Sequence, residues 1–93
     1  MQEEIAERVV GRLRERDVFA HVARPAAFRF GVRVVLPDGR EAIWDTDGAA
    51  GLEAQVMLDG VLVGFVPTIP GSEDFDEDAV VDAIAGADYG NGV

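Results

Sequence analysis

Two tight-turn sequences constrain the fold more than any other feature, because each borders runs of alternating apolar residues. Asp59-Gly60 stands between residues 52–58 and 61–66, and Leu36-Pro37-Asp38-Gly39-Arg40 follows the alternating run 27–36. An Asp-Gly pair favours a two-residue hairpin loop, while Pro-Asp-Gly favours a three-residue loop whose glycine is left-handed. The sequence therefore predicts two antiparallel hairpins, and hence four strands.

The register of each hairpin follows from its turn. In the first hairpin Val32 is expected opposite Trp44, because a shift by one residue would bury the Asp45 carboxylate in the core. Direct pairing across the second turn sets three apolar pairs on the inner face of the sheet: Leu58 with Val61, Val56 with Val63, and Ala54 with Phe65.

Two amphipathic segments flank the hairpins. Apolar residues recur every three or four positions over residues 2–17, and Asp74 with Glu77 forms a capping-box-like start to a second helix that ends near Ala85. The predicted fold class is α+β: a two-layer, four-stranded antiparallel sheet flanked by an N-terminal and a C-terminal helix, in the order α-β-β-β-β-α. We expect a single domain over residues 1–86 and a flexible tail over 87–93.

Charge is divided unevenly along the chain, whose formal net charge is −10. Residues 1–40 hold all eight bases, every one an arginine, against six acids, whereas residues 41–93 hold twelve acids and no base. So acidic a surface repels nucleic acid, and direct binding to DNA or RNA is not expected. The composition resembles that of proteins from a salt-rich cytoplasm, where screening removes the self-repulsion. The alternatives are an acidic protein of a GC-rich organism and an acidic nucleic-acid mimic.

Arg8, Arg12 and Arg16 recur every four residues along the first predicted helix, which places three like charges on one side of it. We favour their pairing with the acidic second half of the same chain. The alternative is a docking site for an acidic partner.

The sheet face turned away from the helices is a candidate contact surface. On the predicted registers it carries more apolar side chains than a polar exterior needs, and such patches usually mark an interface. The candidate interface residues are Val35, Ile43, Met57, Leu62, Val66 and Arg33. We expect a homodimer, formed sheet face to sheet face or through an edge strand, with another protein as the alternative partner. A further alternative is that residues 18–26 or the tail cover this face.

The chain holds few residues suited to catalysis. It has one histidine, one serine and one tyrosine, and it has no cysteine, which excludes thiolate chemistry. Ser72 is expected in a turn or capping role, and the run 45–48 lacks the spacing of carboxylates that a calcium loop needs. We therefore expect no catalytic residue, cofactor or metal site. The alternative is a small-ligand-binding or metal-assisted enzyme that uses Asp45, Asp47 and His21.

The first residues are acidic where a signal peptide would be basic, and no apolar run approaches the ~18 residues of a membrane span, so we expect a cytoplasmic protein without a membrane segment. These observations predict a small acidic, non-enzymatic domain that acts through self-association or protein binding.

Overall fold

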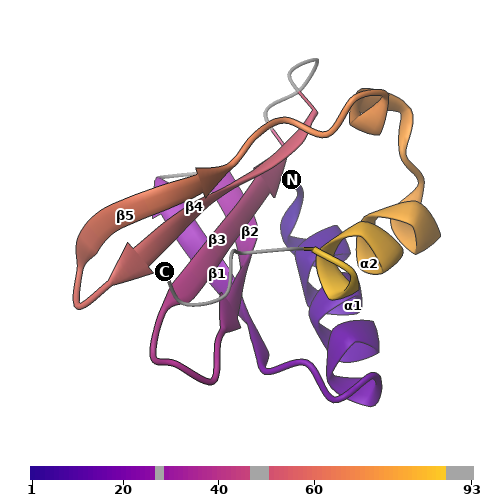
Figure 1. Cartoon of the computed structure of the whole chain (residues 1–93). Coiled ribbons are helices and arrows are strands. Elements are labelled where there is room, and N and C mark those ends of the chain that lie inside the picture. The colour runs from indigo at the N-terminus through magenta and orange to yellow at the C-terminus, as the bar shows by residue number, and fades with distance from the viewer. Residues whose placement is uncertain (27–28, 47–50, 88–93) are drawn as a thin grey trace.

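The computed structural model describes residues 1–26, 29–46 and 51–87. Its elements are α1 (Glu3–Glu15), β1 (Ala20–Ala26), β2 (Arg29–Val35), β3 (Glu41–Thr46), β4 (Leu52–Leu58), β5 (Val61–Val66), the 3₁₀ turn η2 (Ser72–Asp74) and α2 (Glu77–Ala85). Figure 1 shows two layers, with both helices on one face of the sheet. The predicted α+β class, with a helix before and a helix after an antiparallel sheet, is confirmed.

The sheet has five strands, so the predicted count of four is wrong. It is an antiparallel meander in the order β1-β2-β3-β4-β5, and β1 is the strand that the prediction omitted. Residues 20–26 alternate only briefly before Pro25, and a proline is tolerated in a strand only at an edge or a bulge. β1 is an edge strand, and its pairing with β2 is irregular between Ala23 and Ala26.

The first hairpin, formed by β2 and β3, has the predicted register. Val32 pairs with Trp44, and both side chains are fully buried. In the loop, Gly39 at φ 92° is left-handed, and its N–H donates to the Leu36 carbonyl oxygen at 3.0 Å. Because this position favours glycine, the loop length and hence the register are fixed by the local sequence.

The second hairpin, formed by β4 and β5, has the predicted turn but not the predicted register. Asp59 at φ 51° and Gly60 at φ 79° supply the two left-handed positions of the turn, and Leu58 pairs with Val61 as expected. Further along, the register shifts because β5 contains one extra residue, Val63, which forms a β-bulge.

The bulge overturns the other two pairs predicted for this hairpin. Val56 pairs with Gly64 instead of Val63, and Ala54 pairs with Val66 instead of Phe65. After one inserted residue, every later side chain in the strand points to the opposite face of the sheet. Val66 consequently packs against the core, while Phe65 is 66% exposed.

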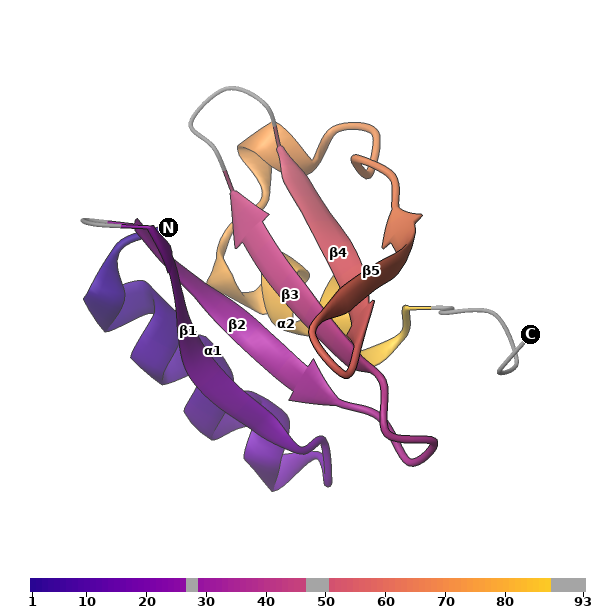
Figure 2. The same cartoon turned by 90° about the vertical axis from the view of Figure 1, so that its left-hand side faces the viewer.

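The core lies between the inner face of the sheet and the two helices, which Figure 2 shows from the side of the sheet. α1 packs on β1 and β2 and also against α2. The buried residues come from both helices and from the four strands β1 to β4: Ala6, Val9, Val10, Leu13, Ala20, Val32, Val34, Ala42, Trp44, Leu52, Ala54, Val56, Val80, Val81 and Ile84. Among the described residues, neither helix is long and apolar enough to cross a membrane.

The helix ends differ slightly from the predicted ones. α1 is shorter than the predicted span 2–17, and α2 begins after Asp76, whose Oδ1 accepts from the Ala79 N–H at 2.8 Å. The predicted cap, Asp74, instead ends the turn η2. Because Asp76 satisfies a free N–H of the first helical turn, it is the effective N-cap. The helix ends at Ala85 before Gly86, as predicted.

Ser72 has the structural role expected of it. Its buried hydroxyl accepts from the Leu52 N–H at 2.7 Å and donates to the Ile69 carbonyl oxygen at 2.5 Å. The hydroxyl therefore ties the start of β4 to the turn before α2.

Candidate interaction surface

The arginine ridge of α1 is paired inside the fold. Three ion pairs join it to α2: Arg8 with Glu77 at 3.0 Å, Arg12 with Asp78, and Arg16 with Asp82 at 2.7 Å. The preferred interpretation, pairing with the acidic half of the same chain, is confirmed. These three guanidinium groups are consequently not an unoccupied docking site for an acidic partner.

The other arginines whose side chains the structure describes are also engaged. Arg24, Arg33 and Arg40 lie near carboxylates, although the Arg33 pair with Glu41 is long at 3.9 Å. Arg14 donates from Nε to the Ala20 carbonyl oxygen at 2.9 Å and lies 3.1 Å from His21 Nδ1 through Nη2. The acids outnumber the arginines, so the charge that remains unbalanced on the surface is negative.

The structure does not bring together the residues of the alternative enzymatic site. His21 of β1 pairs with Arg33 of β2, and Arg33 pairs in turn with Ile43 of β3. Asp45 is two residues further along β3 than Ile43. At about 4.8 Å between strands and about 3.4 Å per residue, the Cα atoms of His21 and Asp45 are about 12 Å apart. Asp47, the third residue of that site, lies outside the described residues.

Asp45 instead holds the N-terminus. Its Oδ1 lies 3.1 Å from the Met1 ammonium nitrogen, which also donates to the Phe30 carbonyl oxygen at 2.9 Å. The side chains of Met1 and Asp45 are 4% and 12% exposed, while the two hydrogen bonds of the ammonium are partly buried. This geometry gives Asp45 a structural partner. No cluster of three or more His, Asp or Glu residues that could hold a metal ion occurs in the described part of the chain.

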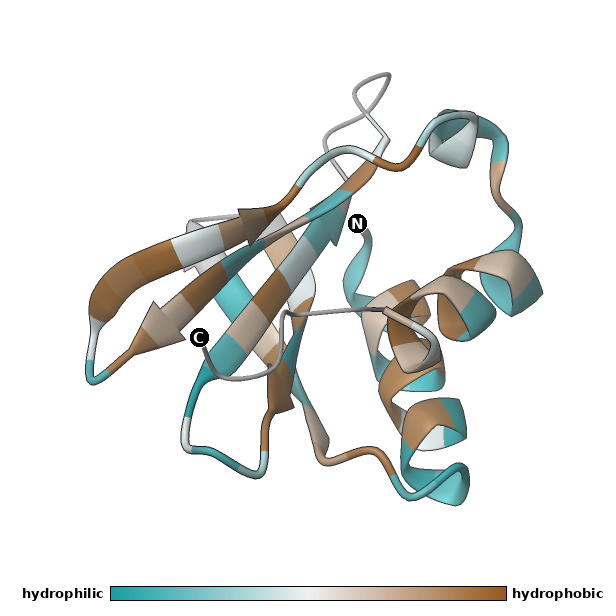
Figure 3. Ribbon diagram, in the orientation of Figure 1, coloured by the Kyte–Doolittle hydropathy of each residue, from teal (hydrophilic) through white to brown (hydrophobic). Residues whose placement is uncertain are grey.

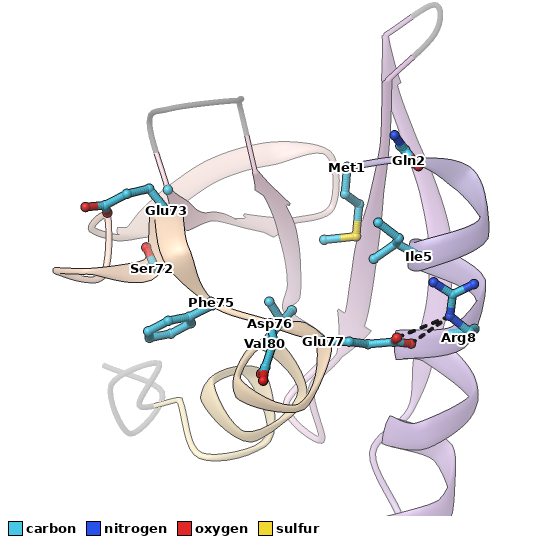
Figure 4. Close-up of a pocket in the computed structure, with 11 residues that line it drawn as sticks. Met1, Gln2, Ile5, Arg8, Ser72, Glu73, Phe75, Asp76, Glu77 and Val80 are labelled. Atoms are coloured by element: carbon cyan, nitrogen blue, oxygen red, sulfur yellow. Dashed lines mark hydrogen bonds and ion pairs between the residues drawn. The ribbon is translucent and has the colours of Figure 1, made fainter.

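A hollow in the described surface lies between the start of α1 and the segment from η2 to α2. It has a volume of about 520 Å³ and is lined by Met1, Gln2, Ile5, Arg8, Gly51, Ser72, Glu73, Phe75, Asp76, Glu77 and Val80. Figure 4 shows that Arg8 and Glu77 face each other across one side of it. Ser72 and Asp76 are already hydrogen-bonded to the backbone. These polar groups therefore serve the fold, and we find no nucleophile paired with a base among them.

The outer face of the sheet carries most of the candidate interface residues. Two neighbouring rows cross it, one formed by Val35, Glu41, Met57 and Leu62 and the other by His21, Arg33, Ile43, Gln55 and Phe65. Val66 does not belong to this face, because the bulge turns it inward. The predicted position of Val66 is therefore wrong, and Phe65 takes its place on the outer face.

The exposed apolar side chains concentrate on the second hairpin. Of the six large apolar residues that are exposed among those described, five lie between residues 58 and 65. Figure 3 shows this apolar stretch running along β5, at the edge of the sheet that is far from both helices. These five residues, which we call the β5 patch, are Leu58, Val61, Leu62, Val63 and Phe65.

Sequence reasoning missed Phe65 because it assigned that residue to the inner face, and it missed Val63 because it did not foresee the bulge. Leu58 and Val61 form the predicted inner-face pair, but they are exposed where the sequence reasoning expected them to fill the core. One available signal was Gly64, since an isolated glycine inside a strand often marks a bulge. A second was charge, because residues 60–72 contain no charged residue in a chain that is 28% charged.

The two edges of the described sheet differ in protection against pairing. β1 carries Arg24 and Pro25 and has an irregular register, which are the devices that prevent edge-to-edge contact. β5 shares one of these devices, the β-bulge at Val63, but it contains neither a charge nor a proline, and within the described residues no strand pairs with its outer edge. β5 therefore presents an apolar edge with a row of available backbone donors and acceptors.

The fold and this surface define a two-layer α+β domain with an apolar sheet edge that no other described strand pairs with. Comparison with known proteins adds no identification, since the chain matches no protein-family model, no curated protein and no solved structure.

Proposed function

We propose that this chain is a non-enzymatic association domain, which works in a salt-rich cytoplasm and self-associates through the β5 patch. The observation that carries the proposal is the exposure of Phe65, Val61 and Val63, at 66%, 62% and 51%, on a strand that no described helix covers. These exposed apolar side chains, which lie on both faces of the hairpin at the edge of the sheet, are favourable to remove from water.

The size of the β5 patch indicates a reversible contact. Taking about 150–200 Å² for a fully exposed Val, Leu or Phe residue, the five exposed fractions correspond to roughly 450 Å². A standard stable interface buries about 800 Å² on each partner, and transient contacts bury less. We therefore expect a weak dimer that exchanges with the monomer.

Salt is expected to strengthen this association. Each chain brings a net charge of −10, so two chains repel each other at low ionic strength. At about 1 M salt the Debye length falls to about 3 Å, which screens the repulsion and leaves the apolar contact in place. An acidic nucleic-acid mimic predicts the opposite dependence, because its binding to a basic partner weakens as salt rises.

Light scattering over a series of protein concentrations, in about 0.1 M and 1 M KCl, tests the proposal. As the protein concentration increases, we expect the mass to rise from 9.9 kDa toward twice that value. In the higher salt this rise should begin at a lower protein concentration. Phe65→Glu should abolish the rise, whereas the matched control Gln55→Glu adds the same charge at the opposing polar position and should preserve it in high salt. A wild-type chain that stays monomeric in both salts would overturn the proposal.

A further inference from the structure

We propose that the occupant of the β5 edge is the β5 edge of a second copy, paired antiparallel about a two-fold axis so that Leu62 lies opposite Phe65 of the second copy. This inference rests on the proposed self-association and adds its geometry. The two five-stranded sheets become one continuous ten-stranded sheet. Because the contact is isologous, it closes at two chains instead of growing into a fibre.

The β-bulge specifies the register. Leu62 and Phe65 lie on the outer face, opposite Met57 and Gln55 of β4, although residues three apart in a regular strand point to opposite faces. The extra residue Val63 places them on the same face. Val61 and Val66, at the two ends of β5, share the inner face in the same way, opposite Leu58 and Ala54.

If all six residues of β5 pair with the six residues of β5 in the second copy, outer-face residues lie opposite outer-face residues, and the inner-face residues at the two strand ends lie opposite each other. Leu62 then lies opposite Phe65 of the second copy on the outer face, and Val61 lies opposite Val66 on the inner face. A register shifted by one residue would set Leu62 opposite Val66 or Gly64, which belong to the inner face. Directly opposed residues in an antiparallel pair share a face, so those registers are excluded.

Charge favours the antiparallel direction. Asp59 precedes β5, while the residues that follow it, Pro67 to Ile69, are uncharged. An antiparallel pair places each Asp59 beside the uncharged end of the other strand, more than about 17 Å from the second Asp59, because the two copies of Val61 already lie five residues apart at 3.4 Å per residue. A parallel pair would set the two carboxylates side by side, where like charges are destabilising.

The absence of charge also favours a second copy over a partner of complementary charge. Residues 60–72 offer neither an acid to attract a basic protein nor a base to attract an acidic one. What they offer is apolar side chains and backbone hydrogen-bonding groups, and the antiparallel edge of an identical strand supplies the same two features in complementary positions.

Cysteine cross-linking tests the register, because the native chain contains no cysteine. Two variants are needed, Leu62→Cys and Phe65→Cys, each examined alone and as an equal mixture under mild oxidation in about 1 M KCl. In the proposed register, residue 62 of one chain lies about 5 Å in Cα distance from residue 65 of the other, within disulfide range. The two copies of residue 62 lie about 10 Å apart, which is beyond that range.

We expect the mixture to form a disulfide-linked dimer that contains one chain of each variant, and each variant alone to stay unlinked. Self-linking of either variant alone would indicate a parallel or shifted pairing and would overturn the inference. A mixture that dimerises by light scattering but does not cross-link would also overturn it, while leaving the self-association standing. Circular dichroism of both variants verifies that they are folded.

Discussion

Arg16 Nη1 lies 2.7 Å from Oδ1 of Asp82, which joins the end of α1 to the last turns of α2. It is the last of three ion pairs between the basic first segment and the acidic second half of the chain. The two helices bury their apolar sides in the core, and these pairs bridge the helices at the surface.

The Arg16 to Asp82 contact is expected to contribute little to stability, and less in salt. Both side chains are about half exposed or more, so a double-mutant cycle with Arg16→Gln and Asp82→Asn should give a coupling of about 0.5 kcal/mol in low salt, falling toward zero near 1 M KCl. Urea unfolding measures it. The control cycle pairs Arg16→Gln with Asp74→Asn and should show no coupling. A coupling that persists in high salt would contradict this account.

Ser72 and Gly51 are expected to act on stability non-additively. Ser72→Ala leaves the buried Leu52 N–H without its acceptor, which costs about 1–3 kcal/mol. Gly51→Ala strains a left-handed residue at φ 87° and places a Cβ 2.6 Å from Ser72 Oγ. The double variant removes that clash, so it should lose less stability in urea unfolding than the sum of the single variants. Strict additivity would show that the two sites are independent.

Asp45→Asn should be destabilising because it removes the carboxylate charge that faces the partly buried Met1 ammonium. Removal of one member of a fully buried ion pair costs about 3–5 kcal/mol and of an exposed one about 0–1 kcal/mol, so we expect about 1–2 kcal/mol for this partly buried pair. Glu53→Gln is a suitable control: Glu53 lies opposite Asp45 on β4, is exposed, and accepts only one hydrogen bond from Thr68 among those described. Its unfolding free energy should change by about 0.5 kcal/mol or less. Equal effects of the two variants would refute the structural role of Asp45.

Asp38 in the first hairpin loop is expected to have a lowered pKa. The main cause is the hydrogen bond from the Arg40 backbone N–H to the carboxylate, with a further contribution from the Arg40 side chain. A carboxyl whose pKa is lower in the folded state stabilises the fold above its ordinary pKa of 3.8, and this contribution is lost as the pH falls through the lowered value.

Nuclear magnetic resonance titration of the Asp38 carboxyl checks this prediction. In Arg40→Ala the pKa should rise, because the guanidinium is gone, yet it should stay below the ordinary value, because the backbone N–H of residue 40 remains. A full return to the ordinary value would show that the guanidinium, and not the backbone, is the main cause.

The parts of the fold that local sequence determines could be predicted. The loop around Gly39 and the Asp59-Gly60 turn require left-handed residues, and the three-residue loop sets Val32 against Trp44. The helices follow from their apolar periodicity. The internal pairing of Arg16 with Asp82 was also foreseeable, since every base lies in the first 40 residues and the later segment is purely acidic.

The parts that depend on packing could not be predicted. β1 alternates over too few residues to identify a strand, and it becomes one because β2 provides an edge for it. The bulge at Val63 is favoured when Gly64 opposes Val56 and the smaller Val66, not Phe65, fills the inner position. The position of the bulge therefore depends on the shape of the core, which cannot be read from a local sequence pattern. The bulge in turn decides which residues of β5 form the contact surface.

The mass of three variants in about 1 M KCl tests the central claim of association through the β5 edge most directly. Val63→Lys places a charge on that edge, whereas Ile43→Lys places one in the middle of the outer face, two strands away. The account predicts that the wild type and Ile43→Lys form dimers of about twice 9.9 kDa, while Val63→Lys remains a monomer. A monomeric Ile43→Lys together with a dimeric Val63→Lys would indicate face-to-face packing and contradict the claim.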